Sequence, residues 1–124
     1  MSSSERVRNI KHAQRESFLL REISSFFLQI AQDNPELQSL YIHHVVLAPE
    51  GSTCSVFFYT NEGKAAFDNL IDTLILYKPS MRASLAKISS GRYVPQLIFR
   101  YAEQVEKQNK VNDLIETLKK EGRL

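Results

Sequence analysis

The sequence predicts a small α+β domain in which helices pack on one face of a three-stranded sheet. Three observations predict this class. Apolar residues recur at spacings of three and four near the N-terminus, two segments rich in β-branched and aromatic residues follow with a short turn between them, and helical and strand patterns then alternate to the C-terminus. The expected element order is αββα-kink-αβ followed by a C-terminal helix. At 124 residues the chain fits one domain.

The first helix is expected over residues 17–31. Its apolar positions fall within one arc of a helical wheel: Leu19, Leu20, Ile23, Phe26, Phe27 and Ile30. Because Ile10 points away from this face, residues 1–14 are predicted to be a basic arm, either loosely held or a separate helical turn. The helix is expected to end at Asp33-Asn34-Pro35, since the residue before a proline is pushed out of the helical conformation.

Two strands are expected next, over residues 40–48 and 53–60, and the short Pro49-Glu50-Gly51-Ser52 turn makes them an antiparallel hairpin. A second helix follows Gly63. Proline is tolerated at the first position of a helix, so Pro79 predicts a kink at Tyr77-Lys78-Pro79 and a new helix to about Ile88.

The remaining elements are a third strand over residues 96–101 and a final amphipathic helix over residues 106–120. One side of this last helix is apolar and carries Val111, Leu114, Ile115 and Leu118. Three strands with helices on one face complete the predicted domain.

The composition excludes several classes of protein. Hydrophobic residues make up 43% and charged residues 24%, as in ordinary globular proteins. Cys54 is the single cysteine, which excludes an internal disulfide framework. The N-terminal residues lack the apolar segment of a signal peptide, and the apolar runs are too short to cross a bilayer. We therefore expect a cytoplasmic protein with no membrane association.

Charge is distributed unevenly along the chain although the net charge is only +2. Residues 73–102 carry five Lys or Arg and no Asp or Glu, whereas residues 31–72 carry one Lys and six acids. This asymmetry favours an anionic partner, which for a small domain usually means nucleic acid. The alternative is that these cations pair in space with the acids of residues 31–72.

The helix–kink–helix segment is a candidate phosphate site. A helix N-terminus presents backbone N–H groups and the positive end of the helix dipole, both of which suit phosphate. Lys78 and Arg82 share one face there, and Ser80 adds a hydroxyl in the first turn. The Gly-x-x-Gly clamp of K-homology modules is absent. The alternative interpretation is that Pro79 simply bends the chain around the core.

No motif predicts catalysis, a metal or a cofactor. His43 and His44 are adjacent in a strand and are expected to point to opposite faces, so they would not bind one ion together. Cys54 is expected to be a small buried hydrophobe. Phosphate-binding glycine loops, nucleophile elbows and paired carboxylates do not occur, so the sequence predicts a non-enzyme.

Two runs of residues carry a resemblance to a known family. They are Met81-Arg82-Ala83-Ser84-Leu85-Ala86 and Arg92-Tyr93-Val94-Pro95-Gln96-Leu97-Ile98-Phe99. Their residues and spacing are similar to the Leu-Arg…Leu-Ala…Arg-x-Val-Pro-x-Leu-x-Phe series of the bacterial ribosome-binding factor A family. The similarity covers about Arg15 to Leu118. The chain departs from the family at the kink, where Tyr77-Lys78-Pro79 replaces the usual Ala-x-Gly.

The resemblance implies a type II K-homology-like fold over residues 15–104, with residues 105–124 as a C-terminal helix and tail. It also implies a non-enzymatic factor, a monomer when free, that binds the immature small (30S) ribosomal subunit and its 16S rRNA and assists rRNA maturation and processing. Carried onto this chain, the expected RNA contacts are Lys78, Ser80, Arg82, Lys87 and Arg92, with Arg8, Lys11 and Arg15 secondary.

A protein-interaction adaptor is the alternative function. It would use the apolar side of the C-terminal helix together with exposed aromatic side chains. Such an adaptor would bind a protein with little dependence on salt and would not sediment with ribosomal particles.

Overall fold

The computed structural model describes residues 3–89 and 93–122, and it contains the predicted order of helices and strands with one short addition. The additional element is a 3-10 helix, η1, after the first long helix. In chain order the elements are α1 (Ser3–Asp33), η1 (Pro35–Ser39), β1 (Tyr41–Leu47), β2 (Thr53–Tyr59), α2 (Lys64–Ile75), α3 (Lys78–Ile88), β3 (Gln96–Tyr101) and α4 (Glu103–Lys120).

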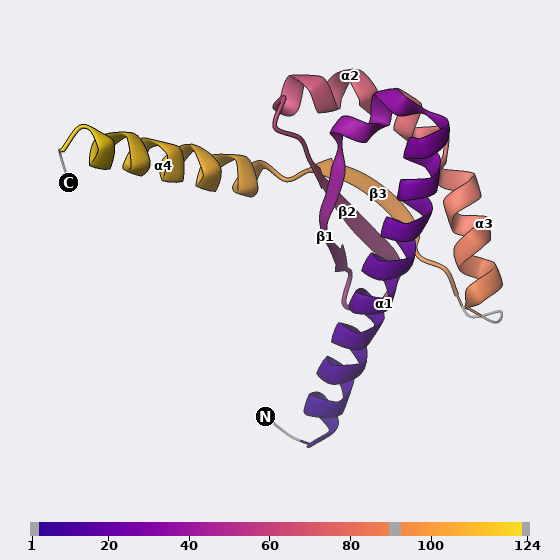
Figure 1. Cartoon of the computed structure of the whole chain (residues 1–124). Coiled ribbons are helices and arrows are strands. Elements are labelled where there is room, and N and C mark those ends of the chain that lie inside the picture. Colours follow the sequence, from indigo (N-terminus) through magenta and orange to yellow (C-terminus); the bar gives the residue numbers. More distant parts are fainter. Residues whose placement is uncertain (1–2, 90–92, 123–124) are drawn as a thin grey trace.

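The three strands form one sheet in the order β1-β2-β3. β1 and β2 pair antiparallel as the predicted hairpin, whereas β2 and β3 pair parallel. A parallel pair needs a crossover connection, and α2 and α3 supply it. Helices α1, α2 and α3 contact the strands, with α1 running across the sheet (Figure 1). The predicted α+β class is therefore confirmed.

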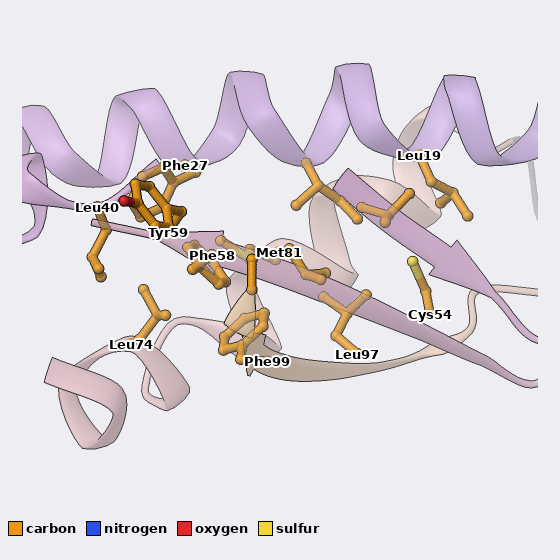
Figure 2. Packing of buried hydrophobic residues seen from close by; sticks show 14 of the residues in the cluster. Leu19, Phe27, Leu40, Cys54, Phe58, Tyr59, Leu74, Met81, Leu97 and Phe99 are labelled. Atoms are coloured by element: carbon orange, nitrogen blue, oxygen red, sulfur yellow. The ribbon is translucent and has the colours of Figure 1, made fainter. Parts of the chain in front are cut away.

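The core lies between α1 and the inward face of the sheet (Figure 2). Leu19, Ile23, Phe27 and Ala31 recur every four residues and bury one face of α1, as the helical spacing predicts. Phe58 is fully buried at the centre of the core. Its ring makes edge contacts with Phe27 and Phe99, with both centroid distances at 5.3 Å. Cys54 is also fully buried and behaves as the expected small hydrophobe.

The expectation for the N-terminal arm is wrong for the described residues, because α1 begins at Ser3 and runs without interruption to Asp33. Its first turns are exposed, which explains why they carry no apolar periodicity. No glycine or proline interrupts this segment, and adding residues to an existing helix gains one hydrogen bond for each residue fixed. A helix can therefore extend well beyond its buried face.

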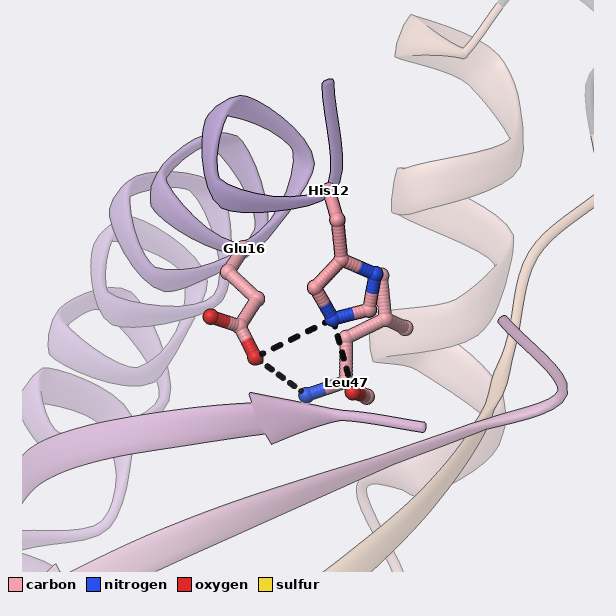
Figure 3. A network of polar contacts seen from close by, with 3 residues as sticks. All are labelled: His12, Glu16 and Leu47. Atoms are coloured by element: carbon pink, nitrogen blue, oxygen red, sulfur yellow. Dashed lines mark hydrogen bonds and ion pairs between the residues drawn. The ribbon is translucent and has the colours of Figure 1, made fainter. Parts of the chain in front are cut away.

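Two side chains attach the early part of α1 to the sheet (Figure 3). His12 Nε2 donates to the Leu47 carbonyl at 3.0 Å, and Glu16 Oε2 accepts from the Leu47 N–H at 2.8 Å. His12 Nε2 and Glu16 Oε2 are 3.6 Å apart. Together they satisfy both backbone groups at the last residue of β1, so residues 12–16 are held against the hairpin.

The expectation that His43 and His44 point to opposite faces of the sheet is wrong. The pairing of β1 with β2 shifts register between Ile42 and His44, so His43 is an extra residue in a β-bulge. The bulge places the two Nδ1 atoms of His43 and His44 2.9 Å apart. His44 also stacks on Phe57, with a centroid distance of 4.4 Å. In the described part of the chain, no group of three or more potential ligands is placed to hold a metal ion.

Helix α4 projects away from the sheet and the other helices (Figure 1). It begins at Glu103, three residues before the predicted start, and has no buried residue. The predicted apolar side is exposed, with Val111 at 52% and Leu114 at 60%. The first half of α4 is attached to the domain: Val105 packs against the core, Glu103 Oε1 lies 3.7 Å from Lys64 Nζ, and Asn109 donates to the Tyr59 hydroxyl at 3.0 Å. None of the helices in the described ranges is long and apolar enough to span a membrane.

Candidate nucleic-acid interface

The predicted kink separates two helices. α2 ends at Ile75, and α3 begins at Lys78 with Pro79 in its first turn. Tyr77 occupies the N-cap position and makes no side-chain capping bond. Ser80 is exposed in the first turn of α3. This helix N-terminus is therefore flanked by Lys78 and by the hydroxyl of Ser80, as the sequence predicts.

Lys78 lies over the edge strand of the sheet. Its Nζ is 5.0 Å from the centroid of the Phe99 ring, a cation–π geometry. The side chain is half-buried, so only part of its charge faces solvent. Lys87, two turns further along α3, is exposed.

Arg82 connects α3 to the segment that leads into β3. Its Nε donates to the Pro95 carbonyl at 3.2 Å, and its Nη2 donates to the Val94 carbonyl at 3.1 Å. Both bonds are charge-assisted, and together they use one side of the guanidinium fork. Arg82 therefore positions the segment that leads into β3.

Arg15 reaches the same segment from α1. Its Nη2 donates to the Tyr93 carbonyl at 3.2 Å, across 78 positions of sequence. The same guanidinium lies against Gly51 in the hairpin turn. Arg15 and Arg82 thus hold three consecutive carbonyls, those of residues 93–95, from two different helices.

The expected site residues fall into two groups. Lys78, Ser80 and Arg82 surround the start of α3. Lys11 and Arg15 belong to α1 and lie beside the C-terminal end of α3. Arg8 is exposed further along α1. Arg92 lies outside the described residues. Among the residues that the structure describes, Lys78, Arg82 and Lys87 form no ion pair with an acid, so the alternative of pairing with residues 31–72 is wrong for these three.

A groove of about 780 Å³ separates α1 from the end of α3. The Tyr93–Pro95 segment closes its third side. Its lining combines basic, neutral polar and apolar side chains: Lys11, Gln14, Arg15, Phe18, Leu19, Leu85, Ile88, Ser89, Tyr93, Val94 and Pro95.

Sequence reasoning did not single out Tyr93, Phe18 or Ile88 as site residues. Tyr93 is 63% exposed and Ile88 is 43% exposed, both beside the cations of α1. An exposed aromatic residue next to basic side chains is a signal for nucleic-acid binding. That signal exists only after folding, because α1 lies about 80 positions before Tyr93 in the sequence.

Glu16 contributes to the shifted pKa values of two groups of the hairpin, Cys54 and His44. Burial raises the pKa of the Cys54 thiol to about 11, with Glu16 raising it further and Arg15 lowering it. Burial lowers the pKa of His44, and the neighbouring His43 lowers it further, whereas Glu16 raises it. The Cys54 thiol is therefore protonated at neutral pH and is a poor nucleophile.

The order αββααβ, with helices on one face of a mixed sheet, defines the class of protein: an α+β domain with the type II K-homology-like fold. The ribosome-binding factor A family model matches residues 11–115. The chain therefore belongs to the ribosome-binding factor A family.

Solved structures share the fold. The crystal structure of ribosome-binding factor A from Thermus thermophilus is similar with a TM-score of 0.61 and 24% identity, covering 73% of this chain and 93% of that one. A homology model of the Thermus thermophilus factor, fitted into a cryo-EM map of a 30S–RbfA complex, is similar with a TM-score of 0.50 and 27% identity. That match covers 68% of this chain and 87% of the other. Among curated proteins no match was found.

Proposed function

We propose that this protein binds the small (30S) ribosomal subunit through its 16S rRNA and assists maturation and processing of that rRNA in the cytoplasm without catalysis. The observation that carries the proposal is membership of the ribosome-binding factor A family over residues 11–115. The Thermus thermophilus relative fitted into the map of a 30S complex supports the same partner.

The charge distribution supplies the physical basis. Lys87 and Arg8 are exposed on α3 and α1, and Lys78 and Ser80 flank the start of α3. Cations placed in this way neutralise phosphates and fix the orientation of the protein on folded RNA. They do not select a base sequence. Arg15 and Arg82 contribute by holding the backbone of residues 93–95.

Binding of this kind acts on RNA conformation by differential affinity. A protein that binds one local arrangement of an immature rRNA more tightly than another shifts the population toward the first. The shift requires no bond to be broken and no nucleotide to be hydrolysed. This mechanism fits a chain whose sequence holds no motif for catalysis.

Salt-dependent cosedimentation with purified small subunits tests the proposal. If about five phosphates are contacted, log K falls with log salt at a slope of about −4. Changing Arg8→Glu together with Lys87→Glu is expected to weaken binding by at least tenfold, because both side chains are exposed. The matched control is Lys107→Glu with Lys110→Glu on α4, which makes the same charge change at exposed positions remote from α3.

A slope near zero would contradict the proposal, as would equal losses of affinity for the two double variants. None of the four side chains is buried, so both double variants are expected to remain folded. Thermal melting followed by circular dichroism checks this.

A protein-interaction adaptor is the second candidate, and one observation favours it. Helix α4 presents Val111, Leu114 and Ile115 to solvent, at 52%, 60% and 38% exposure. Apolar side chains in a row on a projecting helix suit a protein partner. The same sedimentation experiment separates the two functions, because an adaptor would bind a protein independently of salt and would stay out of the subunit fractions.

A further inference from the structure

The groove between α1 and the end of α3 has an apolar floor. Leu19 and Leu85 are almost fully buried at 3% and 1% exposure, and Pro95 is buried beside them. Phe18 and Ile88 extend this surface toward solvent. The volume of about 780 Å³ lies within the range of cavities that enclose small organic ligands.

The rim of the groove is basic on one side. Lys11 and Arg15 belong to α1, and no Asp or Glu lines the groove among the residues that the structure describes. Lys11 is exposed and makes its charge available to a bound group. An apolar floor beneath an uncompensated basic rim is complementary to a ligand with a planar apolar face and a negative charge on one side.

Tyr93 also lines the groove. Arg15 holds the backbone of this residue through the bond to its carbonyl oxygen, while 63% of the tyrosine remains exposed. The tyrosine is thus carried on a segment that Arg15 holds, and most of its surface is open to a ligand. Stacking on aromatic side chains is the usual way in which proteins hold unpaired bases.

We propose that this groove holds an unstacked nucleotide of single-stranded RNA, with its base between Tyr93 and the apolar floor and its phosphate beside Lys11. The proposal rests on the proposed function and adds a specific ligand, because a duplex buries its base faces by stacking and cannot present one to the groove. Binding through this groove therefore selects unpaired over paired RNA.

Fluorescence anisotropy with the full chain tests the proposal. One probe is a fluorescein-labelled single-stranded RNA of twelve nucleotides, and the other is the same strand annealed to its complement. Tyr93→Ala is expected to weaken single-strand binding by about tenfold and to leave duplex binding within twofold. Tyr93→Phe keeps the ring and is expected to restore wild-type affinity. Leu28→Ala, at a residue that is 64% exposed and does not line the groove, is the matched control.

Equal losses for the single strand and the duplex would overturn the proposal, as would a Tyr93→Ala variant that binds the single strand like the wild type. A labelled amphipathic peptide of alternating Leu and Glu is the third probe. If that peptide binds in a Tyr93-dependent way and the single-stranded RNA does not, the groove is a protein site and the proposal fails.

Cosedimentation with small subunits is measured in parallel. If the Tyr93→Ala variant still binds both the subunits and the single strand like the wild type, only the groove proposal is refuted. If the wild type itself shows no salt-dependent binding to the subunits, the proposed function is refuted.

Discussion

The guanidinium group of Arg15 lies directly against Gly51: a Cβ placed on this glycine would be 2.7 Å from Nη1. The same arginine donates to the carbonyl oxygen of Tyr93 at 3.2 Å. One side chain of α1 thus contacts both the β1–β2 turn and the segment that precedes β3. The guanidinium group can occupy this position only because residue 51 has no side chain.

Gly51→Ala tests this relationship. Gly51 has φ of +79°, in the left-handed region where an alanine costs about 1 kcal/mol or more, and the new Cβ would also displace the guanidinium. We expect the free energy of unfolding, measured in urea, to fall by about 1–2 kcal/mol. In an Arg15→Ala background the steric part disappears, and the cost of Gly51→Ala is expected to be smaller. Identical costs in the two backgrounds would show that the contact with Arg15 carries no energy.

Arg82→Lys is expected to destabilise the fold although it keeps the positive charge. Nε and Nη2 of arginine reach the carbonyls of Pro95 and Val94 from one planar fork, whereas the compact ammonium of a lysine lacks this geometry and is expected to bind the two oxygens less well. The partly exposed position limits the expected loss to about 1 kcal/mol. Lys87→Gln, at an exposed residue of the same helix, serves as the control and is expected to leave the urea midpoint unchanged. If Arg82→Lys unfolds at the wild-type midpoint, the two bonds do not stabilise the segment.

The stability of the protein is expected to depend on pH through His44. Burial lowers the pKa of His44 below its ordinary value of 6.5, with His43 adding to the effect and Glu16 opposing it. Between 6.5 and the lower folded pKa, the unfolded chain binds more protons than the folded one. The free energy of unfolding therefore falls as the pH drops through this window and is flat above it with respect to His44.

His44→Phe isolates this contribution, because phenylalanine can keep the stacking on Phe57 and cannot titrate. The free energy of unfolding of the wild type is expected to fall relative to that of His44→Phe as the pH drops below 6.5. Urea unfolding at several pH values between about 5 and 8 measures it. A difference that is constant over this range would show that the His44 pKa is the same in the folded and unfolded states.

Two leucines at opposite ends of the burial scale distinguish the core from α4. Leu85 is 1% exposed and Leu114 is 60% exposed. Leu85→Ala removes buried contacts and leaves a cavity, so we expect it to cost about 2–5 kcal/mol. Leu114→Ala is expected to stay within about 0.5 kcal/mol of the wild type. Thermal unfolding followed by circular dichroism gives both values, and a large loss for Leu114→Ala would mean that α4 packs against something in solution.

Much of the fold could be predicted because local patterns agree with the tertiary structure. The third strand spans Gln96–Tyr101, the range that the sequence predicts, because Leu97, Ile98 and Phe99 are typical of a strand and the strand buries alternate residues. The break at Pro79 was expected for the same kind of reason, since the missing N–H of proline suits the first turn of a helix. Residues 3–14 were missed because an exposed helix carries no apolar periodicity.

The candidate site could be predicted only in part. The acid-free stretch identified Lys78 and Lys87 as cations without acidic partners, and the structure agrees for the residues it describes. The roles of Arg15 and Arg82 at residues 93–95 could not be predicted, because a bond to a backbone carbonyl leaves no mark on the composition. The bulge at His43 was missed for a similar reason, since one extra residue in a strand changes the pairing and not the sequence pattern.

The sequence by itself determined the α+β class, the order of the elements and the family, because periodicity and motif spacing are local properties of the chain. Only the tertiary structure decided that Arg15 and Arg82 converge on one segment, that Tyr93 and Lys11 line the same groove and that α4 projects with its apolar side exposed. These facts depend on contacts between residues far apart in sequence, whose positions are set by how α1, α3 and the sheet pack around Phe58.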